Sequence, residues 1–295
     1  MARPGRPWCH VRMDVRAIMT PEPISIPGST RLDAALQLMA DEDVRHLPVV
    51  DDGRLVGVVS DRDLLTVVGW LPGPGGGRAT PLSDAGDDVP AGSRSVAEVM
   101  HVDPVTVSPD DTVVTAAVEF VLDRIGCLPV LDDGRLTGIV TEMDMLVSYW
   151  RACRSGLLAG DVDPPVREHM TREARTIGVR TTLEEALQYE RSIHVRHLPV
   201  VDEKRVVGMV SDRDLRAAEG ARQPGNTAIG ELMSRAVVTV GPDDPLSQAA
   251  RLMGTNKFSA LPVVEDGHLV GIVTLSNILD HCIDNLREPE GAGPP

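Results

Sequence analysis

Apolar and polar positions recur along the chain in one order, four times over. In the first copy, residues 24–26 alternate as a half-buried strand does, and apolar side chains in 32–39 recur every three or four residues, as in an amphipathic helix. The apolar stretches 47–50 and 55–59 flank an Asp-Asp-Gly turn, which favours a β-hairpin. A second helix is predicted to begin in the polar segment 60–63. Each copy therefore predicts a β-α-β-β-α unit.

The copies keep the same spacing throughout. In every copy a Pro follows an anchoring Met by 29 residues, and an Asp or Asn follows that Met by 44. The Met–Pro–Asp/Asn sets are Met19, Pro48 and Asp63; Met100, Pro129 and Asp144; Met170, Pro199 and Asp214; and Met233, Pro262 and Asn277. Four copies with no insertion between these positions indicate a true internal repeat.

The fold class is therefore α/β, built as α+β repeats. We predict repeats at 12–68, 94–150, 164–220 and 227–286, with a flexible Gly/Pro-rich linker at 69–93. The glycines of that linker could suggest a phosphate-binding loop, but no Gly-Lys-Ser/Thr follows them.

Local signals refine each unit. The first helix has a residue suited to capping at one position in every copy, and Pro245 would then be the first helical residue of the fourth. Strands such as Leu-Val-Gly-Val-Val (55–59) are apolar on both faces and need cover on two sides, so one repeat cannot stand alone and repeats must pair. The predicted N-caps are Thr30, Asp111, Thr181 and Asp244.

Composition narrows the function. A formal net charge of −15, a pI near 4.9 and only seven aromatic residues argue against a nucleic-acid binder. No apolar run approaches the ~18–20 residues that cross a bilayer. The basic N-terminus lacks the apolar core of a secretory signal. Four scattered cysteines without a Cys-x-x-Cys pair predict reduced thiols in a cytoplasmic protein.

One motif carries the candidate chemistry: Gly, two aliphatic residues, Ser or Thr, two variable residues, then Asp or Asn. It recurs at 57–63, 138–144, 208–214 and 271–277. As a capping box, the hydroxyl and the acid three residues later would satisfy the start of a helix. As a binding site, the helix N-terminus would favour an anion, and the carboxylate would suit the vicinal diol of a ribose. The two interpretations are compatible.

A second feature is present in only two copies. Arg45-His46 and Arg196-His197 stand just before the strand in repeats one and three, where repeats two and four have Gly126-Cys127 and Ser259-Ala260. A purely structural position would hold similar residues in all copies, so these pairs indicate phosphate contacts. The alternative is that the arginines pair with surface acids.

Other chemistry is weakly supported. His194 and His197 lack further ligands, so no metal site is predicted. The Asp61/Asp63 and Asp212/Asp214 pairs lack an accompanying nucleophile, so the chain is not predicted to be an enzyme and needs no catalytic cofactor.

The chain resembles the CBS (cystathionine-β-synthase) domain over nearly its whole length. The resemblance is carried by the Met followed by Thr, Ser or His that opens each copy, by Leu-Pro-Val-Val, by Asp-Asp-Gly, and by Gly-x-x-Ser/Thr-x-x-Asp. CBS domains associate as tandem pairs called Bateman modules. The resemblance implies two modules, repeats one with two and three with four. It also implies binding of AMP, ADP, ATP or another adenosine derivative between paired repeats.

The resemblance assigns roles residue by residue. Ribose hydroxyls would be held by Asp63, Asp144 and Asp214; ribose and phosphate would lie near Ser60, Thr141, Ser211, Arg62 and Arg213; phosphates would face Arg45, His46, Arg196 and His197; and the base would border Thr20, Ile24 and Val58. Two departures stand out. Asn277 replaces the Asp in repeat four, and Arg175 takes the position of Ile24 in repeat three.

These observations predict a regulatory protein that senses adenine nucleotides without catalysis. No effector domain is recognisable, so it would act in trans on a partner that the sequence does not name, and a homodimer stays open. The alternative is a ligand-free structural or oligomerisation module, whose acids serve only as helix caps.

Overall fold

The computed structural model describes residues 13–68, 70–71, 80–81, 94–123, 125–155, 163–193, 195–221 and 223–286. Most of the predicted linker lies outside these residues, as does His194. Repeat one contains η2 (Val15–Ala17), β1 (Thr20–Pro21), α1 (Leu32–Asp41), β2 (His46–Asp51), β3 (Arg54–Ser60) and α2 (Asp61–Val68). Repeat two contains η4 (Val96–Glu98), β6 (His101–Val102), α3 (Val113–Leu122), β7 (Cys127–Asp132), β8 (Arg135–Thr141) and α4 (Glu142–Arg154).

The second half repeats this order. Repeat three contains η5 (Val166–Glu168), β9 (Thr171–Arg172), β10 (Ile177–Gly178), α5 (Leu183–Ile193), β11 (His197–Asp202), β12 (Arg205–Ser211) and α6 (Asp212–Gly220). Repeat four contains α7 (Ile229–Leu232), α8 (Leu246–Asn256), β13 (Ala260–Glu265), β14 (His268–Thr274) and α9 (Leu275–Leu286). Within the predicted linker, β4 (Trp70–Leu71) pairs with β5 (Thr80–Pro81).

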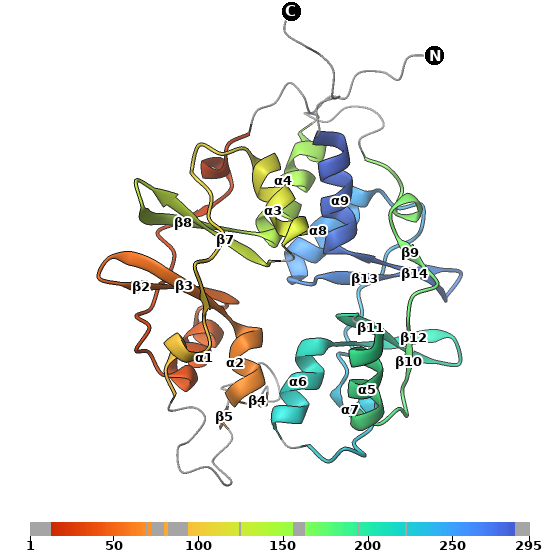
Figure 1. Ribbon diagram of the computed structural model, residues 1–295. Coiled ribbons are helices and arrows are strands. Elements are labelled where there is room, and N and C mark those ends of the chain that lie inside the picture. Colours follow the sequence, from red (N-terminus) through yellow and green to blue (C-terminus); the bar gives the residue numbers. More distant parts are fainter. Residues whose placement is uncertain are drawn as a thin grey trace, which may run out of the picture.

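The four repeats form two modules that lie side by side (Figure 1). In each module the hairpins occupy the middle, and helices lie at both ends. At one end, α3 and α4 of repeat two pack against α8 and α9 of repeat four; at the other, α2 of repeat one packs against α6 of repeat three. The predicted fold class and the pairing of one with two and three with four are thus confirmed.

The hairpin predicted in every repeat is present. In repeat one, Asp52 and Gly53 form its turn with φ of 49° and 76°. Two consecutive residues with positive φ define the type I′ turn, whose twist matches the flanking strands. Repeat three makes the same turn with Glu203 and Lys204, at φ of 47° and 77°. The turn geometry is therefore kept even where glycine is absent.

Each repeat begins with a short helical segment that packs into the other repeat of its module. The Val15 N–H of repeat one donates to the Asp111 carbonyl of repeat two at 2.8 Å. In the other direction, the Val96 N–H of repeat two donates to the Thr30 carbonyl of repeat one at 2.8 Å. Module two has the same exchange, from Val166 to Asp244 and from Ile229 to Thr181. All four donating residues are fully buried: Val15, Val96, Val166 and Ile229. The core of each repeat is completed by its neighbour.

This exchange corrects the predicted helix starts. The four N-cap predictions are wrong by one residue, because the residue after each predicted cap is extended and bridges the neighbour's entering segment. Asp111 and Asp244 instead close turns, accepting the Ser108 and Gly241 N–H groups at 2.6 and 2.7 Å. The bridged pairs are Arg31 with Ser95, Thr112 with Asp14, Thr182 with Ala228 and Pro245 with Pro165. Pro245 is thus the N-cap of α8 and not its first helical residue.

The predicted strand at 24–26 is likewise wrong in extent. Only Ile26 pairs there, through one parallel bridge to Val49, while β1 lies on β8 of repeat two with Thr20 opposite Ile139. The segment from Thr20 to Ile26 crosses from the sheet of repeat two to that of repeat one, so each of its ends pairs over only one or two residues.

The anchoring methionines pack on the glycines of the partner repeat. A Cβ on Gly57 of β3 would lie 2.7 Å from the Met100 Sδ and 2.9 Å from the His101 carbonyl oxygen. Gly138 faces Met19 in the same way, Gly208 faces Met233, and Gly271 faces Met170. Glycine recurs here because the crossing segment approaches the hairpin too closely for a side chain.

The buried apolar residues form separate cores at one end of the molecule and a shared core at the other. Repeats two and four share one cluster, which includes Phe120, Tyr149, Leu261 and Ile278. Repeats one and three each have a cluster of their own. In the middle of module one, Val58, Cys127 and Ile139 pack together where the two hairpins meet, which gives the apolar strands the second covered face that their sequence predicts.

The close approach at Gly57 gives a stability prediction. Gly57→Ala places a methyl group against a backbone carbonyl that cannot rotate away, and overpacking of this kind costs about 1–3 kcal/mol. We expect a clearly lower urea midpoint. Gly241→Ala is the matched control, because a Cβ there meets only ordinary contacts, the nearest at 3.6 Å. Equal midpoints for the two variants would contradict the packing described here.

Candidate functional site

The recurring Gly-x-x-Ser/Thr-x-x-Asp/Asn motif forms a capping box in all four repeats. In repeat two, one oxygen of Asp144 accepts the Thr141 N–H at 2.8 Å and its hydroxyl at 2.6 Å, while the Asp144 N–H donates to that hydroxyl at 3.3 Å. Ser60 with Asp63 and Ser211 with Asp214 repeat these contacts. The capping interpretation is therefore correct for each acid.

The cap uses only one carboxylate oxygen. In Asp144 and Asp214, Oδ2 makes the capping contacts, and Oδ1 accepts no hydrogen bond from another described residue. In Asp63, Oδ1 lies 3.4 Å from the His101 Nε2 of repeat two. In Asp144 and Asp214 the cap thus leaves one carboxylate oxygen for another donor, so capping and ligand binding are compatible in one side chain.

The predicted residues are brought together across repeats and not within them. Thr20 of β1 pairs with Ile139 of β8, the strand that leads to Thr141 and Asp144. His101 pairs with Val58 on β3, which leads to Ser60 and Asp63. We name these the Asp144 site and the Asp63 site. Each takes its capping box from one repeat and its entering strand from the other.

Sequence reasoning missed the second entering strand. His101 and Val105 stand at the same distances from Met100 as Thr20 and Ile24 do from Met19. Ile24 and Val105 are large apolar side chains that remain 39% and 38% exposed. The repeat spacing could have identified both residues, had it been applied across the pair of repeats.

Module two contains the same two arrangements. Ser234 bridges Met209 beside Ser211 and Asp214, which forms the Asp214 site. Thr171 of β9 pairs with Ile272 on β14, the strand that leads to Asn277. Arg175, the other departure, lies just after β9. Both departures noted in the sequence therefore fall in one place, the Asn277 site.

Asn277 changes what that site offers. Its amide oxygen accepts the Thr274 N–H at 2.9 Å and the Thr274 hydroxyl at 2.8 Å. The cap is preserved, but the remaining amide group is an NH₂, which can only donate. A diol that needs an acceptor finds none on this side chain.

The histidines of the two Arg-His pairs are half-buried. Burial lowers the pKa of His46 and of His197 from 6.5 to about 4, so both imidazoles are neutral at pH 7. A Cβ on Gly126 would lie 2.8 Å from the His46 Nε2, so the small residue of repeat two leaves room for the histidine of repeat one. The difference between repeats is thus partly a matter of packing.

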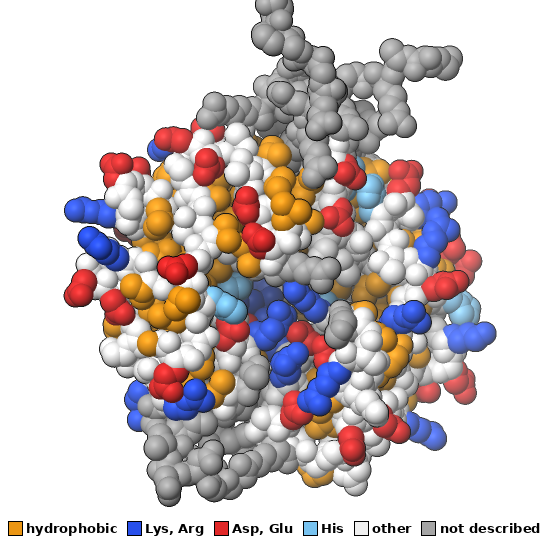
Figure 2. Space-filling model, viewed as in Figure 1, with side chains coloured by type: hydrophobic (Ala, Val, Ile, Leu, Met, Phe, Trp, Pro, Cys, Tyr) orange, Lys and Arg blue, Asp and Glu red, His pale blue; other side chains and the backbone are white. Residues whose placement is uncertain are grey.

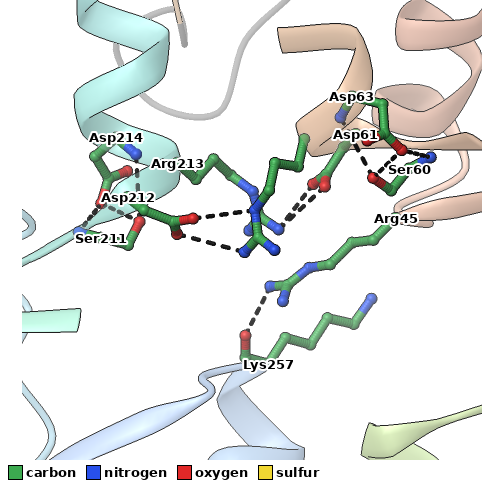
Figure 3. Close-up of polar contacts among 10 residues, drawn as sticks. Arg45, Ser60, Asp61, Asp63, Ser211, Asp212, Arg213, Asp214 and Lys257 are labelled. Atoms are coloured by element: carbon green, nitrogen blue, oxygen red, sulfur yellow. Dashed lines mark hydrogen bonds and ion pairs between the residues drawn. The ribbon is translucent and has the colours of Figure 1, made fainter. Parts of the chain in front are cut away.

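The arginines gather where the two modules meet, as the central basic cluster of Figure 2 shows. Arg62 Nε lies 3.0 Å from Asp212 Oδ2, and Arg213 Nη2 lies 2.9 Å from Asp61 Oδ2. Arg45 points toward the same place and donates to the Lys257 carbonyl at 2.8 Å (Figure 3). The pKa of Arg45 is lowered by its burial and by the nearby Arg213. The partner of Arg45 is a carbonyl, not the surface acid of the alternative interpretation.

Glu142 is the acid that repeat two adds to this region. Burial raises its pKa from 4.5 to about 7, against the opposing effect of Arg196 and Arg62. Its backbone N–H donates to the Gly126 carbonyl at 3.3 Å. Glu142 is thus a weakly charged acid beside strongly charged arginines.

Other site types are not found in the part of the chain that the structure describes. That part contains no group of three or more His, Cys, Asp or Glu side chains able to hold a metal ion. No helix within it has the length and apolarity needed to cross a bilayer.

Glu142 gives a pH prediction. Between pH 4.5 and 7 the unfolded chain loses this proton while the folded chain keeps it, so this residue makes stability fall as pH rises. Glu142→Gln should therefore stabilise the protein at pH 8 by about 1–3 kcal/mol more than it does at pH 5, as measured by urea unfolding. The exposed Glu42→Gln is the control. A pH-independent effect of Glu142→Gln would contradict the assignment.

Comparison with known proteins agrees with this architecture. A model of the CBS domain matches residues 15–69, 96–150, 166–220 and 229–284. A 33.4 kDa protein of Thermofilum pendens is 30% identical over 273 residues, covering 86% of each chain. The protein MJ1225 of Methanocaldococcus jannaschii is 25% identical over 276 residues, covering 88% of this chain and 94% of the other.

The crystal structure of MJ1225 superposes with a TM-score of 0.72 at 23% identity, over 92% of this chain and all of that one. The fold is therefore shared across the whole four-repeat arrangement. With all four repeats matched and paired in two modules, the chain belongs to the CBS domain family.

Proposed function

We propose that this protein is a regulatory, non-catalytic sensor of adenosine nucleotides. The observation that carries the proposal is the double use of the capping acids: one oxygen of Asp144 or Asp214 starts a helix, and the other is left for a ligand hydroxyl. A carboxylate at a helix start also lies beside free N–H groups and a positive dipole end, which favour an anion.

The surrounding residues fit the three parts of a nucleotide. Half-exposed Ile24 and Val105 offer apolar surface to a base. Asp63, Asp144 and Asp214 offer acceptors to ribose hydroxyls. Arg45 and Arg213 point toward one another from the two modules (Figure 3), and Arg62 pairs with Asp212 across the same contact. All three offer charged donors to phosphates. The neutral His46 and His197 could add hydrogen bonds but no charge.

This reasoning favours three sites over four. The Asn277 site combines an asparagine whose oxygen is used by its cap with an arginine in place of the aliphatic residue. We propose that it does not hold a ribose as the other three do.

The proposed regulation acts in trans. The ligand would be AMP, ADP, ATP or a related adenosine compound, and the signal would pass to a separate protein partner in the cytoplasm, with or without dimerisation of this chain. The competing function is a ligand-free assembly module. It is favoured by the shared apolar core of repeats two and four, which holds the modules together without any ligand.

Aspartate-to-asparagine variants separate the two functions. Asn277 shows that asparagine keeps the capping contacts, so Asp144→Asn should leave the urea midpoint nearly unchanged. The same change removes the charged acceptor, and a charge-assisted hydrogen bond contributes about 1.5–3 kcal/mol. Calorimetry with AMP, ADP and ATP should therefore show about 10–100-fold weaker binding at the altered site.

Asp63→Asn and Asp214→Asn should behave in the same way at their own sites. Asp144→Ala is the control that removes cap and charge together, and it should also cost about 0.5–2 kcal/mol of stability. The assembly function predicts no adenosine binding by the unaltered protein even at millimolar concentration, and that result would overturn the proposal.

A further inference from the structure

Two crossed ion pairs join the modules at the α2–α6 contact. Arg62 of repeat one pairs with Asp212 of repeat three at 3.0 Å, and Arg213 of repeat three pairs with Asp61 of repeat one at 2.9 Å (Figure 3). Both acids are well covered, with side chains 7% and 16% exposed for Asp212 and Asp61. The arginines are more open, with side chains 38% and 31% exposed for Arg62 and Arg213. Because the acids are covered, salt screens these pairs less than it screens fully exposed pairs.

The opposite end of the module contact is built differently. There, α3 and α4 pack against α8 and α9 through one continuous apolar cluster that includes Leu146 and Met253. At the α2–α6 end, the buried apolar residues of repeats one and three stay in separate clusters. An added anion does not weaken a contact made by buried apolar side chains, whereas it can weaken a contact made by an ion pair.

The arginines of the crossed pairs are the ones that ligand phosphates would contact. Arg62 lies two residues after Ser60, and Arg213 two residues after Ser211, inside the capping boxes of the Asp63 and Asp214 sites. A phosphate bound in either site would accept hydrogen bonds from the arginine of its own module. That arginine now binds a carboxylate of the other module, so phosphate and carboxylate compete for the same donors.

We propose that Asp61 and Asp212 act as a phosphate-sensitive latch: phosphate binding at Arg62 and Arg213 releases the contact between repeats one and three, while repeats two and four stay packed. This inference rests on the proposed nucleotide sites and adds the way in which they regulate the protein. A released Asp61 or Asp212 faces a bound phosphate of the same sign, so the two modules separate at this end and turn about the apolar end.

The number of phosphates should matter. A monophosphate adds less charge to the region than a triphosphate, so it displaces the carboxylates less completely. ATP and inorganic tripolyphosphate should therefore open the latch further than AMP does.

Distances between spin labels test the opening in the full chain. One labelled pair, Ala40→Cys in α1 with Gln188→Cys in α5, reports on repeats one and three. A second pair, Leu122→Cys in α3 with Arg251→Cys in α8, reports on repeats two and four. All four positions are exposed. The labelled cysteines are introduced into a chain in which Cys9 and Cys153 are replaced by Ser, so that the label does not attach to them. Cys127 and Cys282 are kept, because they are buried and out of reach of the label.

With ATP or tripolyphosphate, the first distance should lengthen and the second should stay the same. If bound ligand leaves both distances unchanged, or shortens the first, the latch is wrong. Lengthening of both distances would also refute it, because the apolar end would then not be the pivot.

Charge-neutral variants test the latch without any ligand. Asp61→Asn with Asp212→Asn should lengthen the first distance on its own and strengthen tripolyphosphate binding about tenfold, since the competing carboxylates are gone. Asp243→Asn is the matched control, because Asp243 pairs with Arg167 inside module two. Unchanged distances in the double variant would sink the latch whether or not nucleotides bind. Absence of adenosine binding in calorimetry would instead sink the proposed function, and the double variant would still report on the latch.

Discussion

The exchange of entering segments between paired repeats is the constraint on which the rest of the structure depends. Val15 and Val96 are fully buried in the neighbouring repeat, and their N–H groups are satisfied only by that neighbour. Buried backbone donors without partners are costly, so neither repeat of a module can close its core alone. The same crossing places each entering strand beside the other repeat's capping box, so the binding sites are a by-product of how the core is completed.

The chain carries a net charge of −15, yet Arg45, Arg62 and Arg213 converge where the modules meet. Arg62 and Arg213 are held there by acids from across the contact, and Arg45 by a backbone carbonyl. Net charge therefore says little about what a protein with an internal basic cluster can bind. What matters is the local arrangement, in which acids pair with Arg62 and Arg213, Arg45 has only a carbonyl partner, and the nearby His46 and Glu142 add little charge.

Much of the fold could be predicted from the sequence, because the hairpins and capping boxes are local. Asp52-Gly53 and Ser60-x-x-Asp63 specify their turn and helix start with residues only a few positions apart. The helix starts after Thr30 and Asp111 could not be placed, because a bridge to another repeat delays them. The grouping of the site residues was missed for the same reason: His101 reaches Asp63 only through a long-range strand pairing. The Arg62–Asp212 pair, which joins different modules, leaves no local pattern at all.

The apolar core shared by repeats two and four has a consequence for the synthesis of the protein on the ribosome. Helix α4 ends at Arg154, but α8, which covers it, begins only at Leu246. At roughly 5–20 residues per second, the faces around Leu146 and Tyr149 stay bare on the ribosome for on the order of ten seconds. Truncated chains that stop before α8 would keep those faces bare permanently. Quality control of this protein should therefore be most demanding for its first half, made before the last repeat arrives to cover it.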